Sequence, residues 1–439
     1  MILFESTRDK SENITFEEAA KKGLAPDGGL YLPERIPELS SGFIKSLQSK
    51  TIAEIGFEVA SAFTSSEVPA DQLKKVLAEA LDFEAPLIRL DNDIYVIELF
   101  HGPTLAFKDY GARFMARLLS ELDDQREDDL IVLVATSGDT GSAVAHGFYG
   151  VPGTQVCLLY PEGKVSKVQE QQMSTLGKNV TAIEVNGTFD HCQKLVKAAF
   201  SDSGLNKQLR LSSANSINIA RLLPQSFYYF SAYGQLAGIS ENGVQPVFSV
   251  PSGNFGNLTA GILAMKMGLP VSRFLAATNI NDVVPEYLRT GTYKPRPSEA
   301  TITNAMDVGR PSNFERIWKL FNGSYEEIKK WIYGSSASDF ETMDCISRVH
   351  ERDGYVADPH TATGILAVEN YRRETGSKNP AVVLSTAHPA KFGDVVEKVT
   401  GIKLETPERL AACLGKKKLT RKMNANFSEL KDFLLMRFG

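Results

Sequence analysis

Cysteine is scarce in this sequence, and the few cysteines carry no spacing typical of a metal site or a disulfide framework. Cys157, Cys192, Cys345 and Cys413 are widely scattered, with no CxxC pair and no zinc-type interval among them. Disulfides persist mainly in oxidising compartments, so reduced thiols in a cytoplasmic protein are the simplest expectation. The sequence therefore predicts no metal site.

The chain also lacks long hydrophobic runs and an excess of positive charge. No stretch of about 20 apolar residues occurs, so no membrane span is expected. Residues 1–13 carry charges where a signal peptide needs an apolar run. The formal net charge is −5, which argues against a nucleic-acid partner. The GxGxxG and P-loop motifs are absent too, which disfavours a dinucleotide fold or a nucleotide-phosphate loop.

Short apolar runs alternate with helix-like segments from about residue 95 onward. The runs lie at 130–134, 156–160, 180–185, 247–250, 274–277 and 381–385. Most are continuous rather than alternating, which is typical of strands buried on both faces of a mainly parallel sheet. The segments 164–176, 189–200, 258–267 and 361–372 are long enough for crossover helices. This order predicts an α/β architecture.

Three regions depart from this alternation. Residues 1 to about 85 are mostly helical in pattern, with helices expected at 52–63 and 70–81. The stretch 300–338 is interpreted as an insertion or a lid-like helical region. The basic tail at 416–418 and 421–422 is interpreted as a solvated helix end, with an anion-binding patch as the alternative.

Polar, glycine-rich loops follow three of the predicted strands, at 136–142, 251–257 and 385–393. Ligands of open α/β sheets bind beyond the carboxyl ends of the strands, so the three loops are expected to meet in one crevice. The loop Ser252–Asn257 precedes a helical run, and its two glycines allow backbone N–H groups to approach an anion. It is the best candidate for a phosphate site, although a tight structural turn is the alternative.

Lys108 stands among apolar and small residues in the segment HGPTLAFKDYG, at 101–111. Partial burial lowers the pKa of a lysine because the charged form loses hydration. Only the neutral amine attacks an aldehyde to form a Schiff base. For a lysine taken in isolation, an ordinary surface charge is the alternative.

Several segments together resemble the threonine synthase family. They are LAPDGGLYLP, HGPTLAFKDYGARF, ATSGDTGSA, SANSINIARLLPQ, PSGNFGN and STAHPAKF, and they occur in the order of that family. The chain looks like the longer bacterial and fungal branch of this pyridoxal-phosphate (PLP) family of fold type II. The resemblance implies two open, twisted, mainly parallel sheets with flanking helices. It also implies a mostly helical N-terminal domain at 1–88 and a catalytic core at 89–439, whose small subdomain spans roughly 112–235.

The resemblance also implies the residues that hold the cofactor. Lys108 would be the Schiff-base lysine, and Thr386 would offer its hydroxyl to the pyridine nitrogen. The cofactor phosphate would lie in the cradle formed by Gly253, Asn254, Phe255, Gly256 and Asn257. Asp139 stands where many relatives of this fold type carry an asparagine facing the ring hydroxyl, and would accept from a protonated O3′. A helix N-cap is the alternative for Asp139.

The reaction implied by the resemblance converts O-phosphohomoserine and water into threonine and phosphate, by γ-elimination and β-addition of water. Asn218 and Arg221 are three residues apart, so a helix would place them on one face, and an arginine binds phosphate through two parallel hydrogen bonds. An ordinary salt bridge is the alternative for Arg221, and a surface charge for Lys391, the second cationic candidate. The remaining candidates for the substrate are Thr104, Ser137, Thr140, Asn215 and Ser216.

Two other functions remain open at this point. A threonine or serine dehydratase would share the cofactor and the fold but would lack a site for the substrate phosphate. A non-catalytic PLP-binding or regulatory protein would not need the Lys108 amine. His101, His360 and His388 are interpreted as structural hydrogen-bonding residues. A monomer or a weak homo-oligomer is expected, without nucleic-acid or membrane partners.

Overall fold

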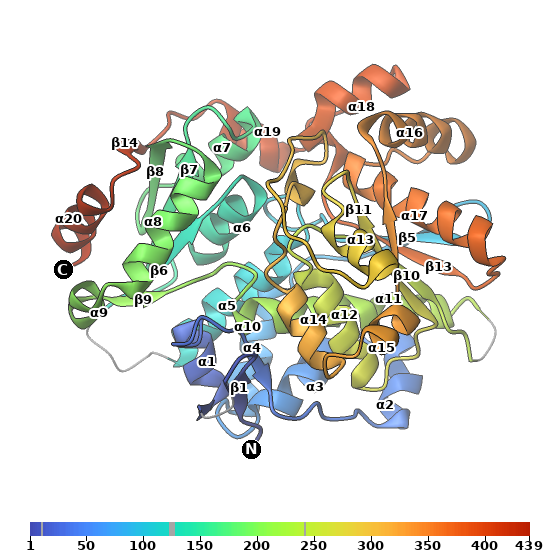
Figure 1. Cartoon of the computed structure of the whole chain (residues 1–439), viewed down its shortest axis with the longest axis horizontal. Helices are drawn as coiled ribbons and strands as arrows, with labels where there is room; N and C mark the ends of the chain where they lie inside the picture. The colour runs from blue at the N-terminus through green and yellow to red at the C-terminus, as the bar shows by residue number, and fades with distance from the viewer. Residues whose placement is uncertain (10–11, 123–127, 241–242) are drawn as a thin grey trace.

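Two large sheets make up most of the fold, together with an N-terminal group of helices that carries a third, small sheet. The computed structural model describes residues 1–9, 12–122, 128–240 and 243–439. Figure 1 shows the two sheets side by side, with the N-terminal helices beneath both of them. Each of the two larger sheets is mainly parallel and lies between helices, which confirms the predicted α/β class.

The larger sheet has six strands in the order β12-β11-β10-β13-β5-β4. Their bounds are β4 Leu87–Arg89, β5 Ile94–Glu98, β10 Val247–Pro251, β11 Arg273–Thr278, β12 Ile332–Ser336 and β13 Ala381–Ser385. Neighbouring strands run parallel, except that β4 is antiparallel to β5. The predicted strands at 247–250, 274–277 and 381–385 are therefore confirmed as β10, β11 and β13.

Helices on both faces explain why these strands are apolar throughout. Successive residues of a strand point to opposite faces. Phe248 and Val382 pack on the face covered by α11 (Phe227–Ala237) and α12 (Gly256–Lys266). Val247 and Val383 pack on the other face, under α16 (Asp339–Asp353) and α17 (Pro359–Thr375).

The smaller sheet has five strands, all parallel, in the order β14-β8-β7-β6-β9. Their bounds are β6 Leu130–Ala135, β7 Thr154–Pro161, β8 Val180–Asn186, β9 Arg210–Ser212 and β14 Thr420–Asn424. The predicted strands at 130–134, 156–160 and 180–185 are confirmed. The predicted crossover helices are confirmed as α7 (Lys167–Ser174), α8 (Phe189–Ser201), α12 and α17.

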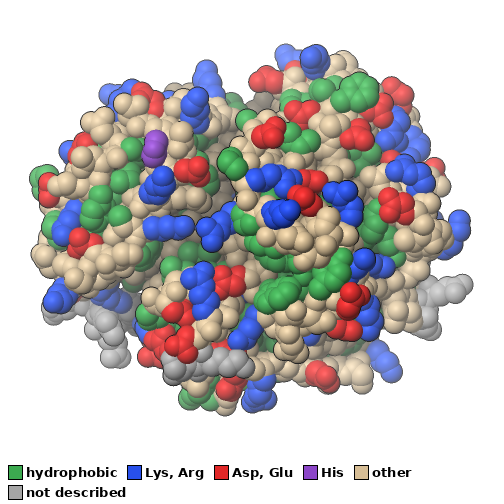
Figure 2. Space-filling view, in the orientation of Figure 1, with side chains coloured by type: hydrophobic (Ala, Val, Ile, Leu, Met, Phe, Trp, Pro, Cys, Tyr) green, Lys and Arg blue, Asp and Glu red, His purple; other side chains and the backbone are tan. Residues whose placement is uncertain are grey.

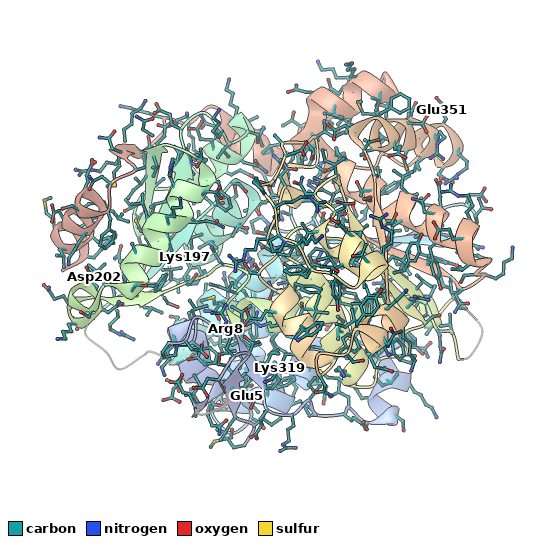
Figure 3. All side chains as sticks on the ribbon, in the orientation of Figure 1. Glu5, Arg8, Lys197, Asp202, Lys319 and Glu351 are labelled. Carbon is teal, nitrogen blue, oxygen red and sulfur yellow. The ribbon has the colours of Figure 1, made fainter. Side chains whose placement is uncertain are left out.

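The C-terminal segment departs from the sequence-based interpretation. The interpretation as a solvated helix end holds for the lysines at 416–418, which are exposed and follow the end of α19 (Glu408–Leu414). It is wrong for Arg421 and Lys422, because they lie in β14, which pairs with β8. Met423 buries its side chain in the core under this sheet, and α20 (Phe427–Phe438) follows it there. Lys431 of α20 pairs with Asp202 at 2.8 Å. Asp202 is labelled at the left edge of Figure 3. The smaller sheet therefore includes residues far outside 112–235.

The N-terminal segment combines four helices with a small antiparallel sheet of order β2-β1-β3. Their bounds are α1 Phe16–Lys22, α2 Ser41–Ser46, α3 Ile52–Thr64, α4 Ala70–Ala80, β1 Phe4–Ser6, β2 Asn13–Ile14 and β3 Tyr31–Pro33. The predicted helices at 52–63 and 70–81 are confirmed as α3 and α4. Thr51 starts α3 with a capping box, since its hydroxyl accepts from Glu54 N–H and the Glu54 carboxylate accepts in return.

The stretch 300–338 is only partly helical. It contains α14 (Phe314–Leu320) and α15 (Tyr325–Trp331), but it ends in β12 at the edge of the larger sheet. The β12 sequence IYGSS has no continuous apolar run, which is why the pattern gave no strand there. Figure 3 shows Lys319 of α14 near Glu5, and these two side chains pair at 3.4 Å. This stretch therefore also ties the N-terminal sheet to the core.

The remaining helices connect these layers. They are α5 Lys108–Leu122, α6 Asp139–Phe148, α9 Ser203–Gln208, α10 Ile219–Leu222, α13 Val283–Thr290, α18 Gly393–Thr400, α19 Glu408–Leu414 and the 3₁₀ turns η1 Leu47–Ser49, η2 Leu223–Ser226, η3 Asn304–Met306 and η4 Pro389–Phe392. Among the helices of the described ranges, none combines the length and the apolar character that crossing a membrane requires.

Candidate active site

One pocket lies where the carboxyl ends of both parallel sheets meet. The loops after β6, β10 and β13 all reach it, as the sequence predicted. Figure 2 shows a hollow between the two lobes, with Lys and Arg side chains gathered beside it. The predicted residues that line the pocket are Lys108, Ser137, Asp139, Thr140, Asn215, Ser216, Arg221, Gly253, Asn254, Phe255, Gly256, Asn257 and Thr386.

The loop from Gly253 to Asn257 forms a cradle of backbone N–H groups at the start of α12. In the described ranges, none of these consecutive N–H groups donates to a protein acceptor. Phe255 adopts a left-handed conformation, with φ 60°, and Asn257 fixes the loop by donating to Pro251 O at 2.8 Å and accepting from Ser252 Oγ at 3.0 Å. Unpaired N–H groups at a helix N-terminus favour an anion such as phosphate.

Glycine is required in this cradle by close packing. A Cβ atom on Gly253 would lie 2.4 Å from the carbonyl oxygen of Ala305, which belongs to η3. The η3 segment is thus packed directly against the cradle. Further along the chain after η3, Asn313 donates its N–H to Asn254 O at 3.2 Å, which ties this stretch to the cradle.

Lys108 begins α5 and extends its side chain into the pocket. Its Nζ lies 3.6 Å from Asp139 Oδ2, and its side chain is only 17% exposed. Burial lowers the pKa of the Lys108 amine, and the nearby Asp139 carboxylate partly opposes that effect. A buried amine of this kind is available in its neutral, nucleophilic form.

Asp139 is held by two donors on its other oxygen. Its Oδ1 accepts from Lys391 Nζ at 2.5 Å and from Gln169 Nε2 at 2.9 Å. Burial alone would raise the pKa of this carboxyl, but Lys391 and Lys108 outweigh burial and hold the pKa well below its usual range. The N-cap alternative for Asp139 is wrong, because Gly138 occupies the N-cap of α6 and Asp139 is its first helical residue.

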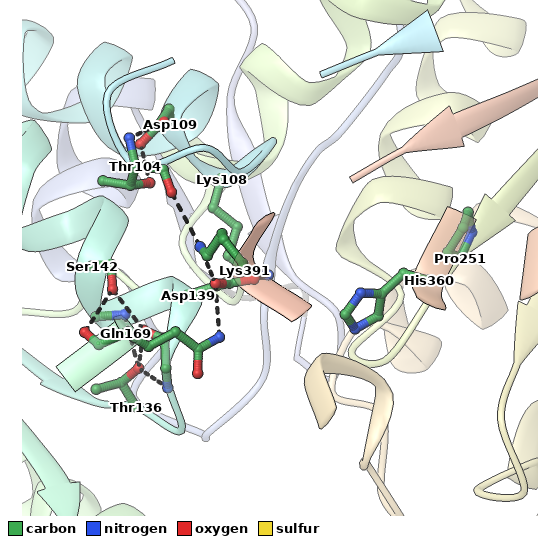
Figure 4. A network of polar contacts seen from close by, with 12 residues as sticks. Thr104, Lys108, Asp109, Thr136, Asp139, Ser142, Gln169, Pro251, His360 and Lys391 are labelled. Carbon is green, nitrogen blue, oxygen red and sulfur yellow. Dashed lines mark hydrogen bonds and ion pairs between the residues drawn. The ribbon is translucent and has the colours of Figure 1, made fainter. Parts of the chain in front are cut away.

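Lys391 and Thr104 do not line the pocket, contrary to their prediction as substrate-binding residues. Lys391 is buried behind Asp139, and its Nζ also donates to Thr104 O at 3.1 Å, as Figure 4 shows. The hydroxyl of Thr104 donates to Asp109 Oδ1 at 2.6 Å. Both side chains therefore use their hydrogen bonds inside the pocket wall. For Lys391 this is expected, because a buried cation needs a buried acceptor.

Asn218 is also not a pocket residue. It caps α10, since its Oδ1 accepts from Ala220 N at 2.9 Å, and its Nδ2 donates to Ala20 O and Ser213 O, each at 2.8 Å. The three-residue spacing from Arg221 was interpreted as one helical face. It does not apply, because Asn218 precedes the first helical residue.

Arg221 lines the pocket with unused hydrogen-bonding capacity. It is 3% exposed and donates one N–H to Ala214 O, while its buried Nε has no partner. Burial lowers the pKa of its guanidinium to about 10, with Asp109 opposing that effect. No carboxylate forms a salt bridge with Arg221 within the part of the chain that the structure describes. The salt-bridge alternative is therefore wrong.

Some pocket residues were not predicted as site residues. They are Phe107, Gly111, Ala135, Thr136, Gln169, Phe189, Gln193, Gln225, Pro251, Asn304, Ala305, Met306, Asp307, Val308 and His360. Buried polar atoms without partners identify two of them, Nε2 of His360 and Oδ1 of Asn304. The opposite edge of the His360 ring is held by Asp358, since Nδ1 lies 3.0 Å from Asp358 Oδ1. Figure 4 shows the ring across the cavity from Lys108. Single-sequence patterns carry no signal for such an atom, because its lack of a partner is a tertiary property.

These features fit a phosphate-bearing aldehyde cofactor. The cradle offers N–H groups to a phosphate, Lys108 offers an amine to an aldehyde, and the unpaired polar atoms of Asn215, Arg221 and His360 await further donors or acceptors. Residues 81–387 match the family model described as "Pyridoxal-phosphate dependent enzyme". The chain is therefore a PLP-dependent enzyme of fold type II.

The flanking regions and the relatives define the family more narrowly. Residues 3–81 match "Threonine synthase N terminus" and residues 361–434 match "Threonine synthase, C-terminal". The threonine synthase of Serratia marcescens is 44% identical over 98% of each chain. The crystal structure of threonine synthase from Escherichia coli matches with a TM-score of 0.91, at 41% identity over 99% of each chain. The crystal structure of PLP-bound threonine synthase from Brucella melitensis matches with a TM-score of 0.92, at 34% identity over 100% of each chain.

The chain belongs to the threonine synthase family of PLP-dependent lyases. This membership decides against the dehydratase and the non-catalytic alternatives that the sequence left open.

Proposed function

We propose that this pocket converts O-phospho-L-homoserine and water into L-threonine and phosphate. One arrangement carries the proposal: the buried Lys108 amine shares a cavity with the free N–H groups of Gly253–Asn257 and with Arg221, whose Nε has no partner. The reaction needs an amine for the cofactor and two separate phosphate sites, one for the cofactor and one for the substrate. The pocket supplies candidates for all three.

The cofactor would be held by groups from both sheets. The N–H groups of Gly253–Asn257 bind its phosphate, and the Thr386 hydroxyl at the end of β13 donates to its ring nitrogen. Lys108 supplies the amine that holds its aldehyde carbon. Asp139 accepts a hydrogen bond from its ring hydroxyl. When bound, PLP supplies an electron sink for the negative charge that develops on the substrate.

The substrate would be held by the opposite wall. Arg221 binds the substrate phosphate, because its buried guanidinium has a free Nε donor and forms no salt bridge with a carboxylate of the described ranges. Ser137 and Thr140 bind the substrate carboxylate. Their hydroxyls and N–H groups have no protein partner in the described ranges, and they stand at the N-terminus of α6. Asn215 and Ser216 extend this wall towards the cradle.

With PLP bound, Lys108 Nζ would be placed to move protons to and from the substrate carbon atoms. Its lowered pKa makes the amine a competent base for the proton at the substrate α-carbon. Two protons leave the substrate, from the α-carbon and the β-carbon, before phosphate is expelled from the γ-carbon. Two protons return, at the γ-carbon and at the α-carbon, and Nζ is placed for these transfers. Water supplies the hydroxyl at the β-carbon and gives its proton to the released phosphate. Asp139 stabilises the protonated amine between these steps from 3.6 Å.

Phosphate and threonine formation from O-phosphohomoserine tests the proposal directly. Wild-type protein is expected to yield the two products in equal amounts, and Lys108→Ala is expected to yield neither. Production of 2-oxobutyrate from threonine, with no turnover of phosphohomoserine, would overturn it.

We further propose that the chain acts in the cytoplasm as a monomer or a weak homo-oligomer. All four cysteines are buried and free, which suits a reducing compartment. The Lys108 amine, the Gly253–Asn257 cradle and Arg221 line one pocket of this chain. The domain division at about residue 88, with a small subdomain centred on 112–235, is proposed with the addition of β14 and α20.

A further inference from the structure

Lys391 is connected to the reacting lysine although it lies outside the pocket. It belongs to η4, and its side chain is completely buried. Its Nζ contacts Asp139 Oδ1 at 2.5 Å and Thr104 O at 3.1 Å. Lys108 approaches the same carboxylate from the pocket side, at 3.6 Å from Oδ2. One carboxylate therefore lies between two lysines, only one of which faces the pocket (Figure 4).

The two carboxylate oxygens of Asp139 have different partners. Oδ1 accepts from Lys391 and from Gln169 Nε2, whereas Oδ2 faces Lys108. The two contacts on Oδ1 fix the orientation of the carboxylate. They also divide its negative charge between the two cations, so that Lys108 does not form an isolated ion pair with it.

We propose that Lys391 is a positioning residue that keeps Asp139 ionised and oriented, and that thereby keeps the Lys108 amine able to lose its proton. The inference rests on the proposed role of Lys108 as the amine that holds the cofactor. It assigns to Lys391 a task other than contact with the substrate.

Two effects of Lys391 on Lys108 have the same sign. Lys391 repels the charged form of Lys108, and it also competes for the carboxylate that would stabilise that form. Both effects lower the pKa of Lys108, in addition to the lowering by burial. Arg221 adds a further repulsion from the pocket side. Removal of Lys391 leaves Lys108 as the remaining cation paired with Asp139 in the described ranges, so the amine holds its proton more tightly.

Other charged groups around Lys391 do not replace it. Asp109 lies near Lys391 but is engaged by Thr104 through two hydrogen bonds. His146 and His388 lie close enough for their pKa values to be lowered, by burial first and by the positive charge of Lys391 in part. Neither histidine contacts Asp139 in the described ranges, so Lys391 alone supplies its buried positive partner from this side.

The test compares Lys391→Met with Gln169→Met. Both changes remove one donor to Asp139 Oδ1, but only the first removes a charge. Apoprotein of each variant is mixed with PLP between about pH 6 and pH 10, and the visible absorption band of the bound cofactor is followed. For Lys391→Met the pH midpoint of the rate of band formation should rise by about one unit, which lowers the rate about tenfold near neutral pH. For Gln169→Met the midpoint should move by much less.

A second measurement separates this inference from the function on which it rests. The reactivity of Lys108 in apoprotein towards an amine-acylating reagent, read by mass spectrometry of the peptide, reports the protonation of the amine without any cofactor. The midpoint should rise by the same unit in Lys391→Met. Failure of wild-type protein to form the visible band would overturn the cofactor role but leave this readout intact.

An unchanged or lower Lys108 midpoint in Lys391→Met, by either measurement, overturns the inference. So does an equal shift in both variants, because a purely structural role does not depend on charge. If Lys391→Met does not fold, Lys391→Gln keeps a polar side chain of similar length without the charge and is expected to give the same upward shift.

Discussion

Asn218 and Arg221 stand three residues apart at the start of α10, yet only Arg221 reaches the pocket. Asn218 precedes the helix and turns its amide towards Ala20 O and Ser213 O. Arg221 is held by one bond to Ala214 O, which leaves its Nε free. Arg221, the proposed ligand of the substrate phosphate, therefore faces the pocket, whereas Asn218 supports the wall that carries it.

Truncation of the arginine should weaken substrate binding selectively. For Arg221→Ala we expect the KM for O-phosphohomoserine to rise by about 10-fold to 100-fold, since a charge-assisted hydrogen bond contributes about 1.5–3 kcal/mol. The occupancy of PLP, read from its visible absorption, should change little. Steady-state phosphate release gives the KM. Loss of cofactor with an unchanged KM would show that Arg221 serves the cofactor instead.

Truncation of the neighbouring asparagine should have the opposite profile. Asn218→Ala removes a helix cap and takes one donor away from each of two buried carbonyl groups, so the free energy of unfolding should fall by about 1–3 kcal/mol. The KM of the folded fraction should stay close to that of wild type. Urea unfolding and kinetics at low temperature provide the two numbers. A large rise in KM at normal stability would return Asn218 to the list of substrate contacts.

A methyl group in the phosphate cradle should interfere with cofactor binding. A Cβ on Gly253 meets Ala305 O at 2.4 Å, so Gly253→Ala must displace either η3 or the cradle. We expect PLP affinity to fall at least tenfold, as measured by titration of apoprotein. Gly415→Ala is the matched control, because its Cβ meets no atom within 4 Å. Equal affinity in both variants would mean that the cradle tolerates the shift and does not set the cofactor position.

Burial patterns explain which parts of the fold were predictable. Strands such as 130–135 and 381–385 are apolar along their whole length because helices cover both faces, and such runs are visible in the sequence. The edge strands β12 and β14 have polar or small residues, with one or two buried anchors each, such as Met423. Their place in the sheets depends on pairing with β11 and β8, which no local pattern encodes.

The site shows the same division between local and tertiary information. The loop Gly253–Asn257 and Lys108 could be predicted, because glycine positions and a lysine segment within family motifs are properties of the sequence itself. Lys391 was assigned to the substrate because its charge was visible, whereas its burial against Asp139 was not. The role of His360 Nε2 was not predicted, because its lack of a partner is visible only in the folded pocket. The partner of the ring on one side is Asp358, only two residues away, and the other side is defined by the pocket alone.

His360 provides a test of whether the pocket uses its unpaired nitrogen. Asp358 Oδ1 accepts from His360 N–H and lies 3.0 Å from Nδ1, so a carboxylate there requires a proton on Nδ1. Where Nδ1 carries the single ring proton, Nε2 is an acceptor without a partner at the pocket. A buried acceptor without a donor costs about 1–3 kcal/mol, which a bound ligand or its water recovers.

Substitution of His360 by asparagine or by glutamine distinguishes the role of Nδ1 from the role of Nε2. His360→Asn keeps an amide near Nδ1 for Asp358 but loses the pocket acceptor, whereas His360→Gln can place an oxygen near Nε2. We expect kcat/KM to fall at least tenfold for His360→Asn and to stay within about threefold of wild type for His360→Gln. Thermal unfolding of both apoproteins serves as the control for stability. The two variants differ only at the pocket end of the side chain. Equal losses of kcat/KM would therefore show that His360 acts through its contact with Asp358 and that the pocket does not use Nε2.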